Sequence, residues 1–280
     1  MESRNQSQSK LTLYRGFENS PNYVWSPFVN KLEARLRFGG LPYILDVGAP
    51  PKAPRGKIPY IFLSRAGPDG QLAGDSRFFG DSTLISQMLV QDGWIDDLNA
   101  DLSPVERAHD LALKALLEDK LYFYQEYEKW MQNYYKMRNH VLWALPYPMK
   151  VVIGYMSYRK ETQMLYGQGT SRFSAEEIKS FTQDIWKNIN ELLFASRNQQ
   201  SKSRSGGGPF WILGGNQPSE VDTTVFGFVV AALVCESAPN TKEMVRGLPV
   251  VVEYAKRIHE RYFPDYTPPS WGQQTGIRQK

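Results

Sequence analysis

The sequence predicts an α+β protein in which a mixed N-terminal part is followed by an all-helical C-terminal part. The first part is predicted by a strand pattern, a helix pattern and a second strand pattern over residues 10–15, 26–38 and 41–47. A strand–helix–strand opening implies parallel strands joined by a right-handed crossover. The second part is predicted by apolar residues that recur only at helical spacing from Ala108 onward.

The size, charge and apolar pattern of the chain argue against several classes of protein. Its 280 residues suggest about two domains at ~150 residues each. The 33 basic and 29 acidic residues leave a formal charge of +4, which is too small and too scattered to predict a nucleic-acid partner. No apolar run reaches the ~18 residues of a membrane span, and the polar residues 1–10 show no signal peptide.

The cysteine and histidine content predicts neither a disulfide nor a metal site. Cys235 is the only cysteine, so no intrachain disulfide and no cysteine-based metal site can form. His109, His140 and His259 lie far apart in the sequence and form no ligand motif, so each is interpreted as a structural or surface residue. A single cysteine fits a reducing compartment, and we expect a cytoplasmic protein.

The first helix pattern begins at a Ser-Pro pair that can carry chemistry. Pro27 suits the first turn of a helix, because the N–H that it lacks would have no partner there. Ser26 then occupies the N-cap, next to unpaired N–H groups and the positive end of the helix dipole. Such a position favours an anion such as a thiolate or a phosphate. From these residues alone the plainer interpretation, a serine that only caps its helix, is favoured.

The next elements complete a small sheet. Residues 48–54 are rich in proline and alanine and predict a loop, after which residues 60–63 predict a strand. Pro59 cannot donate a hydrogen bond to a sheet and must lie at the start or the edge of that strand. Its position suggests a cis peptide bond, although the pattern alone does not justify one. Residues 65–74 predict a hairpin turn, and a short fourth strand is expected near Phe78.

A helix and a polar connector close the first domain. Asp81 and Ser82 precede a helical pattern and can either cap it or face a ligand; capping is favoured for these residues taken alone. The connector at residues 93–103 contains several aspartates whose spacing does not match a calcium loop. We therefore interpret it as an interdomain linker between a domain at residues 10–92 and a helical domain at residues 103–263.

The second domain is predicted to contain a long helix and then several shorter ones. Ser103, Pro104 and Glu106 form a helix start with a capping box. The helix over residues 108–137 would be about 45 Å long, and its aromatic stripe is more typical of a core than of a ligand site. Residues 196–208 predict a mobile low-complexity loop within the domain. Further helices are expected over residues 151–166, 174–195, 223–235 and 250–261.

Several short motifs follow one another along the chain in a characteristic order. They are Tyr14-Arg15-Gly16, Trp25-Ser26-Pro27-Phe28, Lys31-Leu32-Glu33, Gly56-Lys57-Ile58-Pro59, Gly80-Asp81-Ser82, Glu118-Asp119-Lys120-Leu121-Tyr122 and Gly167-Gln168-Gly169-Thr170. Their order and spacing resemble the glutathione transferase superfamily, and more narrowly its failed-axon-connections and metaxin-like branch. The resemblance covers residues 10–263, although no single motif is specific. It implies a thioredoxin-like, glutathione-binding domain followed by an all-α domain.

The resemblance implies roles for residues of the first domain. Ser26 matches the catalytic position, where its hydroxyl would donate a hydrogen bond to the glutathione sulfur and favour the thiolate. Pro59 matches the cis-proline, and the main chain of Ile58 would pair with the cysteinyl part of glutathione. Lys57 would contact a glutathione carboxylate.

The resemblance also implies where the two ends of the ligand site lie. Asp81 and Ser82 match the pair that holds the γ-glutamyl end of glutathione, with Asp81 near the amine and Ser82 near the carboxylate. In this context a ligand role is favoured over simple capping. The electrophile would lie between the domains, against aromatic residues of the long helix. Tyr127, Trp130 and Tyr134 are the candidates.

The function implied by the resemblance is a glutathione-dependent transferase that acts on a small hydrophobic electrophile, in detoxification or secondary metabolism. Because Ser26 stands where thioredoxins have a cysteine, thiol–disulfide exchange at this position is impossible. Conjugation, glutathione-dependent ether cleavage and isomerisation stay open, and many proteins of this architecture form homodimers. The alternatives are a non-enzymatic, metaxin-like interaction or sorting protein and a glutathione-binding carrier.

Overall fold

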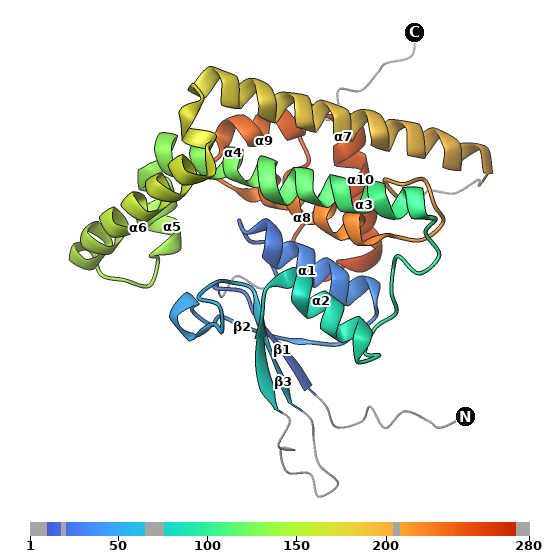
Figure 1. The fold of residues 1–280 in the computed structure, drawn as a ribbon, viewed down its shortest axis with the longest axis horizontal. Helices are drawn as coiled ribbons and strands as arrows, with labels where there is room; N and C mark the ends of the chain where they lie inside the picture. Colours follow the sequence, from blue (N-terminus) through green and yellow to red (C-terminus); the bar gives the residue numbers. More distant parts are fainter. Residues whose placement is uncertain (1–9, 18–20, 65–75, 204–207, 273–280) are drawn as a thin grey trace, which may run out of the picture.

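The computed structural model describes residues 10–17, 21–64, 76–203 and 208–272. Figure 1 shows a small sheet domain formed by the N-terminal part of the chain and a larger domain of helices formed by the rest. Two N-terminal helices lie between the sheet and the helical domain. This arrangement confirms the predicted α+β class.

The sheet domain follows the predicted order of elements. These are β1 (Lys10–Tyr14), α1 (Pro27–Phe38), β2 (Ile44–Asp46), the short 3-10 helix η1 (Pro50–Lys52), β3 (Tyr60–Ser64), β4 (Arg77–Gly80) and α2 (Ser82–Gln91). The strand order is β2-β1-β3-β4, with β1 parallel to β2 and antiparallel to β3, and β3 antiparallel to β4. The parallel pair confirms the strand–helix–strand opening.

The alternation of apolar residues along the strands determines which face of the sheet the two helices cover. Leu11 and Leu13 of β1 and Ile61 of β3 point into a core that also contains Leu32 of α1 and Ile85 of α2. Leu13 and Ile61 are direct cross-strand partners, which places them on the same face. This core fixes α1, and with it the N-terminus of α1, relative to the sheet.

The helical domain contains one long, interrupted helix and several further helices. They are α3 (Pro104–Leu116), the π-helical segment η2 (Leu117–Leu121), α4 (Tyr122–Tyr127), the π-helical segment η3 (Glu128–Gln132), α5 (Tyr134–Val141), α6 (Tyr147–Gln168), η4 (Thr170–Arg172), α7 (Ala175–Ser203), α8 (Glu220–Val234), α9 (Pro239–Arg246) and α10 (Pro249–Tyr262). Ser103 and Glu106 form the predicted capping box at the start of α3. Ser219 and Asp222 form the equivalent box at the start of α8.

The prediction of a mobile loop over residues 196–208 is wrong for residues 196–203. α7 continues as a helix to Ser203, and residues 204–207 lie outside the described residues. The apolar pattern ends near Ala195, but arginine, glutamine and lysine are good helix formers and can extend a helix without it. Ser196 also anchors this end of α7, because its hydroxyl donates to the main-chain carbonyl of Ile212 at 2.8 Å.

Other boundaries differ from the predicted ones for identifiable reasons. α6 begins at Tyr147 rather than at Val151, because Pro148 occupies the first turn, where its missing N–H costs no hydrogen bond. α9 was not predicted from the sequence pattern. The hairpin turn expected over residues 65–74 lies outside the described residues.

The long helix predicted over residues 108–137 is not a regular α-helix. It contains the π-helical segments η2 and η3, and Asn133, with φ −127° and ψ 35°, separates it from α5. A π-helical turn holds more residues than an α-helical turn, so the side chains beyond it are rotated relative to a 3.6-residue period. The aromatic stripe that a regular helix would place on one face is therefore divided among several faces.

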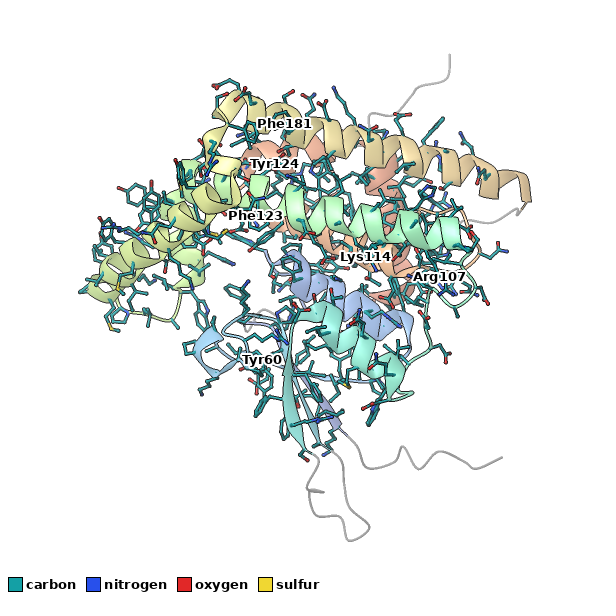
Figure 2. All side chains as sticks on the ribbon, in the orientation of Figure 1. Tyr60, Arg107, Lys114, Phe123, Tyr124 and Phe181 are labelled. Carbon is teal, nitrogen blue, oxygen red and sulfur yellow. The ribbon has the colours of Figure 1, made fainter. Side chains whose placement is uncertain are left out.

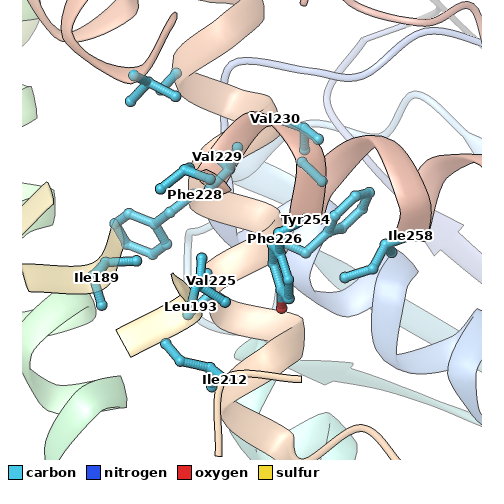
Figure 3. Close-up of a cluster of buried hydrophobic side chains, with 14 of the residues drawn as sticks. Ile189, Leu193, Ile212, Val225, Phe226, Phe228, Val229, Val230, Tyr254 and Ile258 are labelled. Atoms are coloured by element: carbon cyan, nitrogen blue, oxygen red, sulfur yellow. The ribbon is translucent and has the colours of Figure 1, made fainter. Parts of the chain in front are cut away.

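α8 is the central helix of the helical domain, and its residues 221–233 are all buried. Figure 3 shows its side chains packing against those of α7 and α10. The labelled residues of this cluster are Ile189, Leu193, Ile212, Val225, Phe226, Phe228, Val229, Val230, Tyr254 and Ile258. Within the part of the chain that the structure describes, no single helix has the length and apolarity to cross a membrane; α8 and α9 meet that test only together, as a pair bent by 116°.

The backbone of α8 touches the backbone of α1 at Gly227. A Cβ atom added there would lie 2.6 Å from the carbonyl oxygen of Pro27 and 2.7 Å from the amide nitrogen of Lys31. Main-chain atoms of a packed helix cannot move aside as the end of a flexible side chain can. Glycine is therefore required at this position if the two domains are to pack, and the contact falls on the first turn of α1, directly after Ser26.

We expect Gly227→Ala to destabilise the protein by about 1–3 kcal/mol, the usual cost of forcing extra volume into a packed core. Helix propensity alone predicts the opposite sign, because alanine is favoured over glycine by ~1 kcal/mol inside a helix. Gly167→Ala in α6 is the matched control, since a Cβ there meets nothing within 4 Å. Urea denaturation measures both free energies of unfolding. A Gly227→Ala variant that is as stable as the control would contradict the close contact.

Candidate functional site

Ser26 occupies the N-cap of α1 but does not cap it. Its backbone has φ −82° and ψ 115°, the extended conformation expected of an N-cap residue. No hydrogen bond joins its side chain to the first turn of the helix. The residue is half-buried. The hydroxyl is thus available to another acceptor beside the N-terminus of α1, and the interpretation of Ser26 as a simple cap is not borne out.

Asn30 holds the loop that leads into Ser26. Its side-chain NH2 donates to the carbonyl of Val24 at 2.8 Å, and its side-chain oxygen accepts from the N–H of Val24 at 3.3 Å. Asn30 is completely buried, so these bonds satisfy groups that water cannot reach. The position of Ser26 is therefore set from within α1, by a residue that the sequence pattern did not single out.

The peptide bond between Ile58 and Pro59 is cis, as the resemblance implied. Pro59 is buried directly ahead of β3. Within the described part of the chain, no hydrogen bond engages the main-chain N–H or C=O of Ile58. These two groups are therefore free to pair with an extended peptide, as the exposed main chain of a strand does.

Asp81 caps α2, and Ser82 begins it. The Asp81 carboxylate accepts from the main-chain N–H groups of Thr83 at 3.0 Å and Leu84 at 3.1 Å, both through Oδ1. Asp81 has φ +81°, a backbone conformation that non-glycine residues rarely adopt and that often marks functional sites. The structure thus shows for Asp81 the capping role that the resemblance had placed second. Ser82 is only 5 % exposed and lies at the positive end of the α2 dipole.

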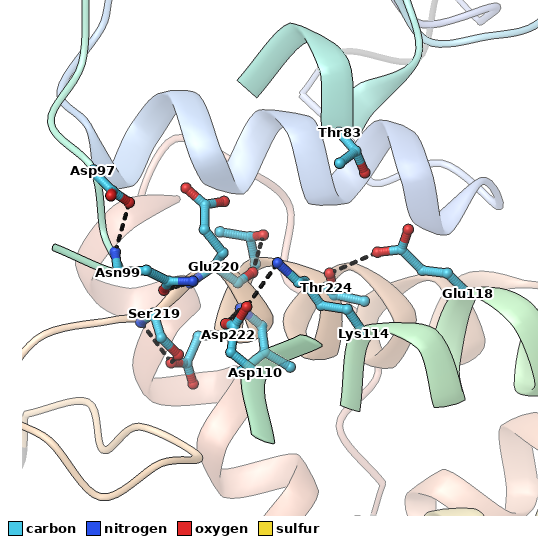
Figure 4. Close-up of polar contacts among 12 residues, drawn as sticks. Thr83, Asp97, Asn99, Asp110, Lys114, Glu118, Ser219, Glu220, Asp222 and Thr224 are labelled. Atoms are coloured by element: carbon cyan, nitrogen blue, oxygen red, sulfur yellow. Dashed lines mark hydrogen bonds and ion pairs between the residues drawn. The ribbon is translucent and has the colours of Figure 1, made fainter. Parts of the chain in front are cut away.

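A buried lysine connects the N-terminus of α2 to the helical domain. Lys31 of α1 donates to the hydroxyl of Thr83 at 2.8 Å and to Glu118 Oε1 at 2.7 Å. Thr224 of α8 donates to the same carboxylate oxygen at 2.9 Å (Figure 4). Because Thr83 follows Ser82, the position of Ser82 depends on how the two domains dock.

Polar contacts from both domains also fix the N-terminus of α8 (Figure 4). The N–H of Glu220 donates to Asn99 Oδ1 at 2.9 Å, and the N–H of Val221 donates to Asp110 Oδ1 at 2.7 Å. The Glu220 carboxylate forms an ion pair with the fully buried Arg35 of α1 at 2.6 Å. α1 and α8 are therefore joined by a buried ion pair as well as by the backbone contact.

Of the three aromatic residues predicted to contact the electrophile, the structure brings Trp130 and Tyr134 together, with 6.4 Å between ring centroids. Tyr127 lines a cavity of about 230 Å³ between α4, η3, α7 and α9, inside the helical domain. Its neighbour on the same side, Tyr124, faces Phe181 of α7 with 5.8 Å between ring centroids (Figure 2). Trp130 is 5 % exposed, and Tyr134 packs against α6. Tyr127 therefore faces the interior of the helical domain, because the π-helical segments turn the aromatic stripe away from a single face. Contact of Tyr127, Trp130 and Tyr134 with an electrophile stays a prediction.

Other aromatic residues of the helical domain reach the loop before α1 and the first turn of α1. His140, at the end of α5, stacks on Trp25 with 3.5 Å between ring centroids and on Phe17 with 4.4 Å. Phe28 meets Tyr122 edge-on at 5.0 Å. The sequence predicts only a structural or surface role for His140, and no motif marks it. The stack results from the break before α5, which the apolar pattern did not reveal.

Several titratable groups surround this aromatic contact. Burial, with a smaller effect from the charge of Lys129, lowers the pKa of His140 to about 4, so the ring is neutral at pH 7. Lys129 and Glu126 form a buried ion pair at 2.9 Å. Burial and repulsion by Glu126 raise the pKa of Glu161 in α6 to about 7, against the attraction of two lysine charges that include Lys57. Lys57, which the resemblance places against glutathione, thus lies close enough to the helical domain for its charge to lower the pKa of Glu161.

Comparisons with known proteins identify the architecture. Residues 27–137 match the family model described as glutathione S-transferase N-terminal domain. Glutathione transferase GSTFuA2 from Phanerochaete chrysosporium is 13 % identical over 90 % of this chain and 98 % of that chain, with a TM-score of 0.54. Glutathione transferase Omega 1C from Trametes versicolor is 12 % identical over 92 % of each chain, with a TM-score of 0.51. Ure2p in complex with glutathione is 11 % identical over 91 % of each chain, with a TM-score of 0.50.

The chain has the glutathione-transferase fold. The predicted fold class, a thioredoxin-like domain followed by an all-α domain, is thereby confirmed. The family model matches residues 27–137, and the solved structures share the fold of the whole chain. In this example of the glutathione-transferase fold, Ser26 stands at the start of α1, the cis-proline at the start of β3 and Ser82 at the start of α2.

We expect Glu161 to make the stability of the glutathione-transferase fold depend on pH. Its pKa in the folded protein, about 7, lies above its ordinary value of 4.5, so the folded state binds the proton more tightly than the unfolded state. The free energy of unfolding should therefore fall as pH rises between these two values. Glu161→Gln lacks this pH-dependent contribution to stability. The difference between the melting temperature of the variant and that of the wild type should therefore shift in favour of the variant from about pH 5 to about pH 8.

Glu243→Gln, a change of an exposed carboxylate on α9, is the control for this experiment. Its melting temperature should follow that of the wild type across the whole range. If Glu161→Gln also runs parallel to the wild type, Glu161 is not protonated in the folded state at neutral pH.

Proposed function

We propose that this protein is a glutathione-dependent transferase in which Ser26 donates a hydrogen bond to the sulfur of bound glutathione. The observation that carries the proposal is that the Ser26 hydroxyl stands at the N-terminus of α1 without capping it. A thiolate in that position would accept the hydroxyl proton in a charge-assisted hydrogen bond and lie at the positive end of the helix dipole.

The stabilisation that this chemistry requires is modest. An unperturbed thiol has a pKa of about 8.5, so free glutathione is mostly protonated at pH 7. Lowering that pKa by ~2 units makes the thiolate the main form and requires about 2.7 kcal/mol. A hydrogen bond to a charged group contributes about 1.5–3 kcal/mol. The helix terminus adds about 0.3–1 kcal/mol, so the two effects together suffice.

We assign the rest of glutathione to the residues that the resemblance implied. The main chain of Ile58, ahead of the cis bond to Pro59, would pair with the cysteinyl part of the peptide. Ser82, at the N-terminus of α2, would donate to the γ-glutamyl carboxylate, which the helix dipole also attracts. Asp81 caps α2 through Oδ1 and can meet the γ-glutamyl amine through Oδ2. The exposed Lys57 would meet the other carboxylate.

We propose that the electrophile binds against the aromatic rings that the helical domain brings to α1. These are Phe28 with Tyr122, and Trp25 with His140. They take the place of Tyr127, whose ring lies inside the helical domain. Thiolate attack on a small hydrophobic electrophile is the common first step of conjugation, glutathione-dependent ether cleavage and isomerisation, and all three stay within the proposal.

The wider setting of this activity rests on the sequence motifs. They favour the failed-axon-connections and metaxin-like branch of the superfamily and a role in detoxification or secondary metabolism. The single cysteine favours a cytoplasmic protein. A homodimer is typical of the architecture and forms part of the proposal.

We expect calorimetry to detect glutathione binding with a micromolar-to-millimolar dissociation constant. Ser82→Ala should weaken it about 10-fold or more, because a hydrogen bond to a charged carboxylate contributes ~1.5–3 kcal/mol. Ser180→Ala on α7 is a matched control, since Ser180 is exposed and lies in the helical domain. The absence of binding at millimolar glutathione would favour the interaction-protein alternative.

We expect Ser26→Ala to bind glutathione but to lose at least about 10-fold in kcat/KM, because one charge-assisted hydrogen bond to the thiolate is removed. The thiolate can be followed directly by its ultraviolet absorbance, and its apparent pKa in the complex should rise in the variant. Full turnover by Ser26→Ala with several electrophiles would show that Ser26 has no catalytic role. Binding by the wild type without turnover of any electrophile would favour a glutathione carrier.

A further inference from the structure

The helices α5 and α6 form a limb that projects from the body of the helical domain (Figure 1). α6 packs on α5, η3 and η4 along one side. Its other side carries large apolar side chains that are exposed. Together with residues of α5 and the connecting turn they form what we call the α5–α6 face. Its members are Tyr135, Trp143, Tyr147, Met149, Val151, Val152, Tyr155 and Met156.

The exposure on this face is large for apolar residues. Tyr135 and Tyr147 are 71 % and 70 % exposed, and Met156 and Val152 are 65 % and 61 % exposed. Single exposed apolar residues are normal on a protein surface, but neighbouring ones mark a binding surface. On α6 the spacing of Tyr147, Val151, Val152, Tyr155 and Met156 makes them neighbours along one side of the helix. The side chains of Tyr147 and Trp143 lie at the end of the limb, in and next to the turn that joins the two helices.

The charge of this limb and of the π-helical segment before it is mostly positive. Residues 129–168 contain six basic residues and one acidic residue, the half-buried Glu161. Lys129 is neutralised by Glu126, and Arg138 is buried under the rings of neighbouring tyrosines. Four basic residues are left, and none of them forms an ion pair with another described residue. They are Lys136, Lys150, Arg159 and Lys160.

We propose that the α5–α6 face binds the surface of membranes that contain anionic lipids. Trp and Tyr favour the boundary between lipid headgroups and acyl chains, where an apolar ring and a polar edge are both satisfied. Valine and methionine side chains on the same face would enter the acyl region, and lysine and arginine around them would meet lipid phosphates. This arrangement of aromatic, aliphatic and basic residues is typical of a helix that lies in the membrane interface.

The charge pattern also favours a membrane over a second copy of this chain. A two-fold interface buries the same patch of both subunits against each other, so it would collect the basic residues of both copies, with Glu161 as the one acidic residue of α5 and α6 to offset them. Like charges brought together in this way oppose association. An anionic bilayer provides the complementary charge and at the same time covers the apolar side chains.

Co-sedimentation of the full chain with vesicles tests the proposal. Binding to vesicles of phosphatidylcholine and phosphatidylserine should be at least about 10-fold stronger than binding to phosphatidylcholine alone, and it should weaken as salt is added. Lys150→Gln combined with Arg159→Gln should weaken it roughly 25-fold, or about 5-fold for each basic residue. Tyr147→Ser combined with Val152→Ser should weaken binding to the mixed vesicles by removing the apolar contact while the charge is kept.

Lys179→Gln combined with Lys187→Gln is the matched control, because both lysines are exposed and lie on α7. This variant should bind like the wild type, and all variants should keep its melting temperature. Absence of binding to the mixed vesicles, or an equal loss in the control pair, would overturn the proposal. The proposal would also be overturned if the protein does not bind vesicles but forms a dimer, and if Tyr147→Ser combined with Val152→Ser dissociates that dimer. The α5–α6 face would then bind a second copy of the chain.

Discussion

The contact between the backbones of α1 and α8 is the constraint on which the rest of the structure depends. α1 packs its apolar side on the sheet and its other side on α8, so it is the element shared by both domains. At Gly227 the two helices approach so closely that not even a methyl group fits between them. Because this contact falls on the first turn of α1, it also supports the main chain on which Ser26 is presented.

Buried charges give this contact its specificity. Lys31 and Arg35 of α1 reach Glu118 and Glu220 of the helical domain, and each cation is almost completely removed from water. Buried ion pairs add little net stability because desolvation offsets their attraction, but breaking one is costly. A shifted docking of the domains would leave these charges unpaired. The register between α1 and α8 is thereby restricted, and the hydroxyl of Thr83, bonded to Lys31, is fixed at the start of α2.

The proposed function rests on the two helix N-termini of the sheet domain. α1 presents Ser26 and α2 presents Ser82, both at the positive end of a helix dipole. The helical domain contributes aromatic rings, and burial lowers the pKa of His140 and raises that of Glu161. In the proposed function the helix N-termini would bind the anionic groups of glutathione, and the aromatic rings would face the electrophile.

The helix starts at which the proposed site lies could be predicted because they depend on local chain chemistry. Pro27 and Ser26 mark a helix start by themselves, and so do Asp81 and Ser82. The roles of Asn30 and His140 could not be predicted, since each depends on a partner that no local pattern indicates. Asn30 bonds to a loop six residues earlier, and His140 stacks on Trp25 from the other domain.

By itself the sequence determined the two-part α+β architecture, the order along the chain of the strands and helices that form the sheet domain, and the helix starts at Ser26 and Ser82. These follow from periodicity, capping and proline, which act over a few residues. Only the tertiary structure decided which aromatic residues face α1. The π-helical segments η2 and η3 rotate everything beyond them, and an apolar pattern that assumes a constant period cannot register such a change. The close approach of α1 and α8 likewise depends on tertiary packing. A single glycine in an apolar helix does not indicate which part of the chain will lie against it.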